Sequence, residues 1–437
     1  MRKEGNIVEF LITLAVAMIG GLMMSRLAKK VSLPAVTAYL VAGLLLGPFV
    51  IGRIGITGLG FPSMAGMEAY SLVTQAALGF IAFTIGNEFR LSQLKSMGRQ
   101  AIVIGILQAV ITTVVVDIAL VALHFIKPDL ISIPVAITLG AIAAATAPAA
   151  TLMVVRQYKA DGPLTKLLLL VVAIDDAVGL VLFSASFGIA KAMEQGTASV
   201  ASIVLEPIIE IVLSLILGVV MGVLLNLIER FFHSGSKRLS ISTAFVLLTV
   251  GLSMIKFQIG GIHCGFSLLL VCMMTGTVFC NICDFSEELM ERVESWSVPL
   301  NILFFVISGA ELDLDILKSP LILMVGVIYI IFRSLGKCSG SYLSCKMTRC
   351  GEKITKHLGI TLLPQAGVAL GMALTAGELM GGDLVRNVVL FAVLVYELVG
   401  PVMTKNALIK AGEICLEGKT SARVPEARNK PGKEHTL

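Results

Sequence analysis

Residues 164–190 read LTKLLLLVVAIDDAVGLVLFSASFGIA, and this stretch decides how the rest of the chain is interpreted. The run is long enough to span a bilayer, for which about 20 apolar residues suffice. Asp175 and Asp176 nevertheless stand side by side in its middle. One carboxylate at bilayer depth costs roughly 3 kcal/mol on insertion scales, and adjacent residues lie about 100° apart on a helix. The pair therefore indicates an ion or proton site, against the alternative of a helix with two satisfied acids in a large soluble core.

The composition places the chain in a lipid bilayer. Of its 437 residues, 56% are hydrophobic, only 14% are charged, and 42 are glycine. Ordinary soluble domains carry about 25% charged residues, and frequent glycine is typical of closely packed membrane helices. The basic residues are scattered through loops without interleaved aromatic residues, so we expect no nucleic-acid partner. The sequence shows no nucleophile–base constellation and no phosphate-binding glycine loop, so we expect neither an enzyme nor a cofactor.

Long apolar runs recur along the chain, and they predict an all-α polytopic membrane protein with about 13 transmembrane helices. No charged or low-complexity linker interrupts the series. Residues 1–409 are therefore expected to form a single membrane domain, and residues 410–437 a short cytoplasmic tail. The expected spans lie near 7–27, 35–51, 69–87, 100–126, 131–155, 163–190, 203–229, 238–256, 262–280, 297–311, 319–345, 354–377 and 384–409.

Lysine and arginine concentrate in alternate loops and in the C-terminal tail. Loops rich in these residues stay in the cytoplasm. Arg26, Lys29 and Lys30 after the first span, and Arg230 with Lys237 after the seventh, belong to this side. An odd number of spans with this bias places the N-terminus outside and the C-terminus in the cytoplasm.

Two segments far apart in the sequence match each other. The first lies at the cytoplasmic end of the third span and the second at the external end of the tenth. Opposite ends predict inverted repeats, an architecture of many secondary transporters, although a match of this length can also arise by chance. The matching segments are Gly86-x-Glu88-Phe89-x-Leu91-x-x-Leu94-Lys95 and Gly309-x-Glu311-Leu312-x-Leu314-x-x-Leu317-Lys318.

The repeat makes the fifth and twelfth spans correspond, and each contains a proline. Pro148 follows Thr146-Ala147, and Pro364 follows Leu362-Leu363. Proline at mid-span disrupts a helix, and such breaks are tolerated at membrane depth where the backbone lines a site or is buried in protein. We therefore expect two crossed discontinuous helices beside the aspartate pair, with two ordinary proline kinks as the alternative.

The eleventh span carries two cations. Arg333 and Lys337 are four residues apart, so they share one helix face. Buried cations need buried anions, and Asp175 and Asp176 are the candidates. The alternative is that one or both cations snorkel to the membrane surface.

Taken together, these residues resemble the monovalent cation:proton antiporters, specifically the bacterial sodium/proton and potassium/proton exchangers. The similarity covers nearly the whole membrane region. One departure is Ala147, where many relatives carry an acidic residue or serine. The segments that carry the resemblance are Ala173-Ile174-Asp175-Asp176-Ala177-Val178-Gly179, Thr146-Ala147-Pro148, Arg333-x-x-Gly336-Lys337, the second-span run from Pro34 to Pro48, and Glu397-Leu398-x-Gly400-Pro401.

The resemblance implies an architecture. It implies a homodimer in the plasma membrane of a prokaryote, built from a dimerisation unit and a mobile core. The core helices would lie near 69–190 and 297–409, and the dimerisation helices near 7–51 and 203–280.

The resemblance also implies residue roles. Asp176 would hold either the monovalent cation or a proton, and this carboxylate is the expected metal site. Asp175 would pair with Lys337 and release it when the cation binds, and Thr146 would add an oxygen ligand. The expected supporting or gating residues are Glu88, Arg333, Pro148, Pro364 and Glu311.

These features together predict a secondary antiporter that exchanges a monovalent cation for protons by alternating access. Sodium is the first candidate, and potassium and lithium stay open. A carboxylate in a poorly hydrated cavity binds protons more tightly than in water, so one site can hold either ion. The alternatives are a sodium-coupled organic-anion symporter, against which the aspartate pair counts, and a cation channel, for which no filter-like motif is visible.

Overall fold

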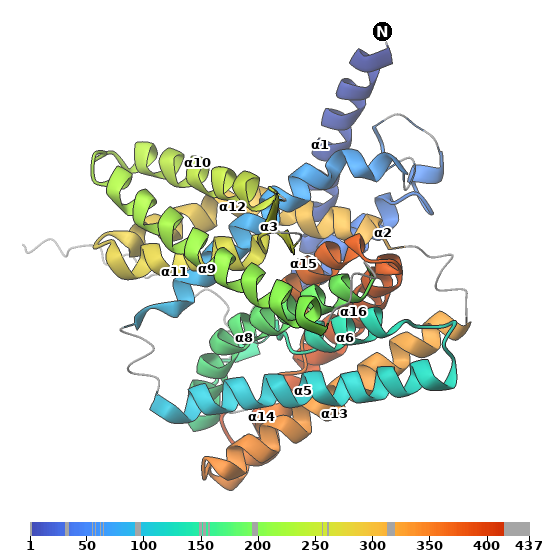
Figure 1. Ribbon diagram of the computed structural model, residues 1–437, viewed down its shortest axis with the longest axis vertical. Coiled ribbons are helices and arrows are strands. Elements are labelled where there is room, and N and C mark those ends of the chain that lie inside the picture. Colours follow the sequence, from blue (N-terminus) through green and yellow to red (C-terminus); the bar gives the residue numbers. More distant parts are fainter. Residues whose placement is uncertain are drawn as a thin grey trace, which may run out of the picture.

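The computed structural model describes residues 2–414 apart from 31–34, 55, 57, 62, 64, 92–97, 148–150, 152–153, 156–157, 195–199, 256, 260–261 and 313–319. The chain is predominantly helical (Figure 1). The first half contains α1 (Arg2–Lys30), α2 (Ala35–Leu46), α3 (Ser71–Gly86), α5 (Gly98–Ile126), α6 (Ile133–Ile142) and α8 (Pro163–Glu194). The second half contains α9 (Val200–Glu229), α10 (Gly235–Ser253), α11 (Leu268–Ile282), α12 (Ser286–Ala310), α13 (Pro320–Met347), α14 (Glu352–Thr361), α15 (Gly367–Thr375) and α16 (Gly382–Ala411). Connections contain the 3₁₀ helices η1 (Gly52–Ile54), η2 (Ala65–Tyr70), η3 (Asn87–Phe89) and η5 (Ala376–Glu378), and the strands β1 (Phe257–Ile259) and β2 (Ile262–Cys264).

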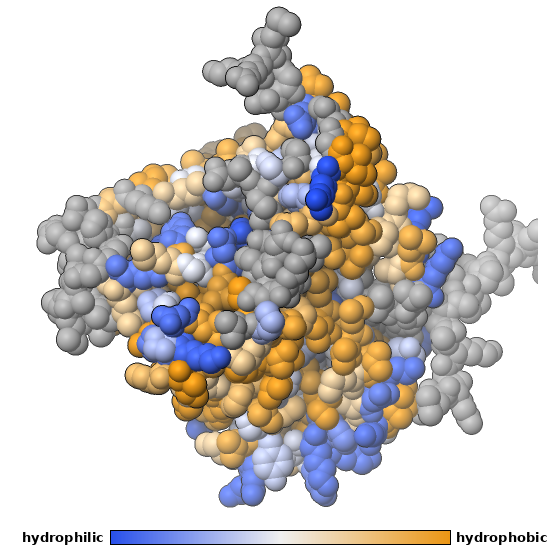
Figure 2. All heavy atoms as spheres, turned by 90° about the vertical axis from the view of Figure 1, so that its right-hand side faces the viewer, coloured by the Kyte–Doolittle hydropathy of each residue, from blue (hydrophilic) through white to orange (hydrophobic). Residues whose placement is uncertain are grey.

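The expected polytopic helical fold is confirmed. Every expected span coincides with a helix or a pair of helices, and 7 of the described helices are long and apolar enough to cross a membrane. Large apolar side chains such as Leu11 of α1, Ile118 of α5 and Ile216 of α9 point outward. Figure 2 shows apolar residues over much of one face of the molecule. Extensive exposed apolar surface is unfavourable in water, so these side chains face lipid.

The fifth and twelfth spans are interrupted. α6 ends at Ile142, and residues 143–147 continue as irregular backbone. α14 ends at Thr361 and α15 begins only at Gly367, after another irregular segment. Over the described residues, both expected breaks are therefore present.

The largest differences from the expected boundaries are at the starts of α11 and α12. α11 begins at Leu268 rather than near 262, because the side chain of Ser267 caps it by accepting a hydrogen bond from the backbone N–H of Leu270. The residues before it form the antiparallel hairpin of β1 and β2. α12 begins at Ser286 rather than near 297, because Glu287 and Glu288 in its first turn favour a helix N-terminus.

Helix packing divides the molecule into two groups. In the first group, α1, α2, α3, α10, α11 and α12 pack on one another, and α9 joins them along α11. The second group contains α5, α6, α8, α13, α14, α15 and α16, and the long helices α5 and α13 lie side by side within it (Figure 1). α3 and α12 pack mainly on α11, α2 and each other.

Glycines at matching points of the repeated segments allow close helix contacts in the first group. A methyl group at Gly86 of α3 would lie 2.2 Å from the Met273 carbonyl oxygen of α11. A methyl group at Gly309 of α12 would lie 2.1 Å from the Leu40 carbonyl oxygen of α2. α3 therefore packs on α11 as α12 packs on α2, which is the relation that inverted repeats require.

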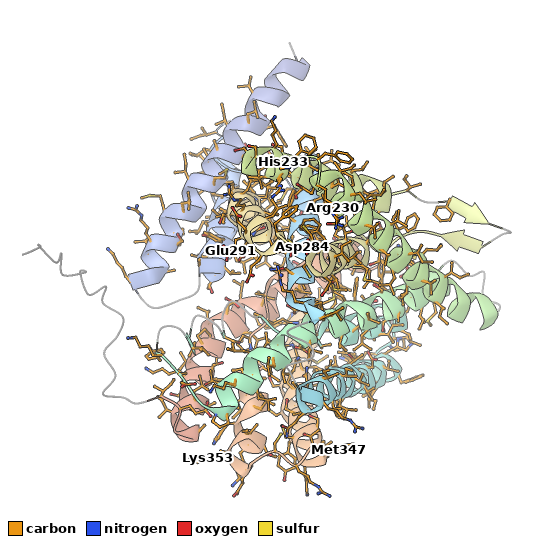
Figure 3. All side chains as sticks on the ribbon, turned by 90° about the vertical axis from the view of Figure 1, so that its left-hand side faces the viewer. Arg230, His233, Asp284, Glu291, Met347 and Lys353 are labelled. Carbon is orange, nitrogen blue, oxygen red and sulfur yellow. The ribbon has the colours of Figure 1, made fainter. Side chains whose placement is uncertain are left out.

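Three turns lie on one side of the molecule, and Figure 3 views this side. They link α9 to α10, α11 to α12, and α13 to α14. The first two touch, because the guanidinium of Arg238 lies 3.6 Å from the ring centroid of Phe285. Residues labelled at these turns or on the adjoining helices are Arg230, His233, Asp284, Glu291, Met347 and Lys353.

We expect Gly309→Ala to destabilise the fold, because its methyl group would overlap the α2 backbone. Overpacking of this kind costs about 1–3 kcal/mol. The matched control is Gly251→Ala in α10, where no heavy atom lies within 4 Å of the added methyl group. Thermal unfolding in detergent, followed by circular dichroism, should show a lower midpoint for Gly309→Ala only. Equal midpoints for the two variants would contradict the packing described above.

Candidate functional site

The two irregular segments meet each other within the second helix group and form a crossing. The backbone N–H of Ala147 donates to the Pro364 carbonyl oxygen at 2.9 Å. The Gln365 side chain donates to the Ile142 carbonyl oxygen, the last residue of α6, at 3.1 Å. The crossing is therefore held by direct hydrogen bonds between the two broken spans.

Arg333 of α13 neutralises the ends of both half-helices. A helix C-terminus leaves carbonyl groups without intrahelical partners. The fully buried Arg333 donates to the Ala143 carbonyl at 3.0 Å, to the Ala145 carbonyl at 2.7 Å and to the Leu363 carbonyl at 2.7 Å. Its guanidinium also lies 4.5 Å from the ring centroid of Tyr396. A cation at the negative ends of two helix dipoles is stabilising, and this explains why the charge is tolerated there.

Lys337 lies one turn further along α13 and is also fully buried. Its Nζ lies 2.7 Å from Asp175 Oδ2. The same ammonium donates to Thr146 Oγ1 at 2.8 Å, to Gln108 Oε1 at 3.1 Å and to the Ala144 carbonyl oxygen. The structure thus brings together three of the residues singled out in the sequence, and Lys337 does not snorkel.

Gln108 of α5 is a site residue that the sequence reasoning missed. Its amide nitrogen donates to Asp175 Oδ1 while its amide oxygen accepts from Lys337. Thr146 Oγ1 donates to Asp175 Oδ2. The available signal was a single amide side chain in the otherwise apolar run GILQAVI of α5.

Asp176 follows Asp175 on α8 and lies about 100° further round the helix. Its side chain is fully buried. Gly179, one turn on, lies against the crossing, because a methyl group there would be 3.6 Å from the Ala145 backbone nitrogen. α8 therefore runs directly beside the broken fifth span at the level of the two carboxylates.

The other site residues predicted from the sequence lie away from the crossing or outside the residues that the structure describes. Glu311 caps the end of α12, and its carboxylate is 3.7 Å from Arg386 Nη1 near the start of α16. Glu311 therefore links the two helix groups away from the crossing. Glu88 belongs to η3, but its side chain lies outside the described part, as does the whole of Pro148.

A cavity of about 950 Å³ opens between the two groups. It is lined by residues of α3, α8, α9, α11 and η5, and Lys191 pairs with Glu378 in its wall at 2.7 Å. Ser184, another lining residue, stands about two helical turns from Asp176 on α8. The cavity therefore lies along the C-terminal part of α8, beyond the two aspartates in the sequence.

Comparison with known proteins agrees with this architecture. The family profile described as "Sodium/hydrogen exchanger, transmembrane" matches residues 14–410, so the chain belongs to the sodium/hydrogen exchanger family. The family and the fold are those of transporters, and they support cation/proton exchange as the function class. No curated protein sequence matches the chain.

Two solved structures show the same fold. The sodium proton antiporter MjNhaP1 from Methanocaldococcus jannaschii, in its structure at pH 8, superposes with a TM-score of 0.70 at 19% identity. That alignment covers 93% of this chain and 99% of that one. The electron-microscopy structure of the same antiporter gives a TM-score of 0.67 at 18% identity, covering 93% and 97% of the two chains.

We expect Lys337→Met to destabilise the protein, because it leaves the Asp175 carboxylate buried without its cation. Removing one partner of a buried pair costs about 3–5 kcal/mol. The double variant Asp175→Asn/Lys337→Met should recover much of that loss. A double-mutant cycle on thermal unfolding midpoints measures the coupling. Strictly additive effects would contradict the pairing.

Arg333→Lys should also destabilise, although it keeps the charge. One ammonium on a shorter chain cannot reach all three carbonyl groups, and each buried polar group left unpaired costs about 1–3 kcal/mol. The control is Lys356→Gln, which breaks the exposed 2.6 Å pair with Glu352. Exposed pairs contribute only about 0–1 kcal/mol. If both variants unfold at the wild-type temperature, the carbonyl-capping role of Arg333 is wrong.

Proposed function

We propose that the protein exchanges a monovalent cation for protons by alternating access at the paired-aspartate site, with sodium as the first candidate. The observation that carries this proposal is the Asp175–Lys337 pair buried at the crossing of two broken helices, with Asp176 fully buried beside it. A structural role does not require two adjacent carboxylates at bilayer depth, and their insertion is costly. Carboxylate oxygens suit a hard cation, so sodium, potassium and lithium are all candidates.

Exchange follows from competition at one site. Asp176 holds either a proton or the cation, because both need the same carboxylate oxygens. A cation that arrives at Asp176 also attracts Asp175 and weakens its hold on Lys337. Thr146 and Gln108, which already contact Asp175, offer oxygen atoms to the cation or to the released ammonium. If Lys337 gives up its proton at this step, two protons move for each cation.

Alternating access follows from the two helix groups. We propose that the second group, which holds the crossing, moves against the first, and that helices near 7–51 and 203–280 form a homodimer interface. The 950 Å³ cavity between the groups gives the external path along α8. The basic turns after α9 and α13 then face the cytoplasm together with the C-terminus, with the N-terminus outside, in the plasma membrane of a prokaryote.

The test is cation-dependent dissipation of a pH gradient in proteoliposomes that contain the purified protein. Sodium, potassium and lithium are each added across mildly acidic to clearly alkaline pH. We expect at least one cation to collapse the gradient. Asp176→Asn should abolish the response, because an amide cannot exchange a proton for a cation.

The matched control is Asp383→Asn, because Asp383 is an exposed carboxylate at the start of α16 that bonds only to its neighbour Arg386 in the described structure. It should keep the wild-type response. No response of the wild type to any monovalent cation would overturn the proposal. Sodium-driven uptake of an organic anion would instead indicate a symporter, and single-channel currents would indicate a channel.

A further inference from the structure

Glu397 of α16 is a buried acid that the site described above does not use. Its side chain is only 1% exposed. Thr37 Oγ1 of α2, itself buried, donates to Glu397 Oε2 at 3.2 Å, and Oε1 has no hydrogen-bond partner among the described residues. Glu397 therefore places a carboxyl group on the boundary between the second helix group and the first.

The inverted repeat relates Glu397 to Asp176. α8 and α16 each follow the broken span of their own half, so they are counterparts. In each helix the acid is followed three residues later by a glycine, in Asp176-x-x-Gly179 and in Glu397-x-x-Gly400.

Both glycines pack against a break in the helix that precedes them. Gly179 lies against Ala145 of the fifth span. A methyl group at Gly400 would lie 2.9 Å from Pro364 Cγ of the twelfth span. The two acids therefore occupy equivalent positions on opposite sides of the crossing.

Within the described structure no cation pairs with Glu397. Arg333 donates to carbonyl groups and stacks on Tyr396, and Lys337 is held by Asp175. A buried ionised carboxylate without a cation is strongly unfavourable. Other ionisable groups on elements that pack against α16 include Tyr39 of α2, Tyr329 of α13, Lys353 and His357 of α14, the aspartate pair of α8, and Glu378 of η5.

We propose that Glu397 is a second proton-binding carboxylate, equivalent in the inverted repeat to Asp176, and that its proton stabilises the contact between α16 and α2. This inference rests on the proposed antiport function, because it assigns a second proton to the same transport cycle. Loss of the proton leaves a charge that needs water or a cation, and this weakens the contact between α16 and α2. Proton release from Glu397 is thereby linked to movement of the two helix groups.

The first test needs no transport. Infrared spectra of wild type and of Glu397→Gln at neutral pH are compared in the region of the protonated carboxyl C=O stretch. The wild-type-minus-variant difference should contain one protonated carboxyl band, which disappears at high pH. Superimposable spectra in this region would show that Glu397 is ionised and would overturn the proposal.

The second test is the pH profile of cation-driven proton movement in proteoliposomes. A glutamine cannot lose the proton, so the α2–α16 contact stays stabilised at alkaline pH. We expect the alkaline rate of Glu397→Gln to fall about tenfold, a coupling typical of linked sites, with a flattened profile. Glu397→Asp, which still titrates, should restore part of the pH dependence. An unchanged profile would overturn the proposal.

The matched control is Glu229→Gln. Glu229 is fully buried between α9 and α10, and like Glu397 it accepts a hydrogen bond from one hydroxyl, that of Ser242 at 2.8 Å. It lies far along the chain from the crossing, and the pH profile of Glu229→Gln should match that of the wild type.

Should Glu397→Gln fail to fold, Thr37→Val removes only the hydroxyl that bonds to Glu397 and must shift the midpoint of the pH profile. Absence of cation-driven proton movement in the wild type would refute the antiport function. An active wild type whose pH profile is shared by the Glu397 and Thr37 variants would refute only the role of Glu397.

Discussion

The structure depends on how two interrupted helices end inside a membrane. Each break exposes carbonyl groups where water is scarce, and an unpaired carbonyl there is costly. Arg333 and Lys337, one turn apart on α13, supply donors to carbonyls on both sides of the crossing. Two cations then sit at bilayer depth, and Asp175 balances one of them. The carboxylate, the lysine and the broken backbone are thus parts of a single electrostatic arrangement.

The proposed function assigns ion exchange to the second acid of the pair. Asp175 already contacts Lys337, Thr146 and Gln108, so its oxygens are in use. Asp176, next in the chain, lies about 100° further round the helix and is also fully buried. The proposed division between a structural and an exchanging carboxylate rests on this difference in direction along α8. The family assignment and the shared fold support cation/proton exchange as the function class.

Much of this was predictable from sequence because membrane helices have strong local signals. The thirteen apolar runs needed only hydropathy, and the two interrupted spans needed the internal repeat and the rules for proline. Lys337 was a candidate partner of the aspartates because buried cations need buried anions and because it lies some distance from either end of its span. Gln108 could not be found in this way, since one amide in an apolar helix has many possible partners. The start of α11 was also missed, because the residues before Leu268 form a short hairpin and a serine cap instead of extending the helix.

The close pairing of α5 and α13 has a consequence for how the family site can vary. Gly336 and Gly340 of α13 lie against Thr112 and Gln108 of α5, and a methyl group at either glycine would come within about 3 Å of the α5 backbone. These contacts fix the distance between α5 and α13, and with it the distance between Lys337 and Gln108. A larger side chain at either glycine would overlap the α5 backbone. Any change in the width of this buried cluster must therefore come from the opposite wall, along α8 and residues 143–147. Variation among natural sequences should accordingly be concentrated on that wall, with the glycine face of α13 nearly invariant.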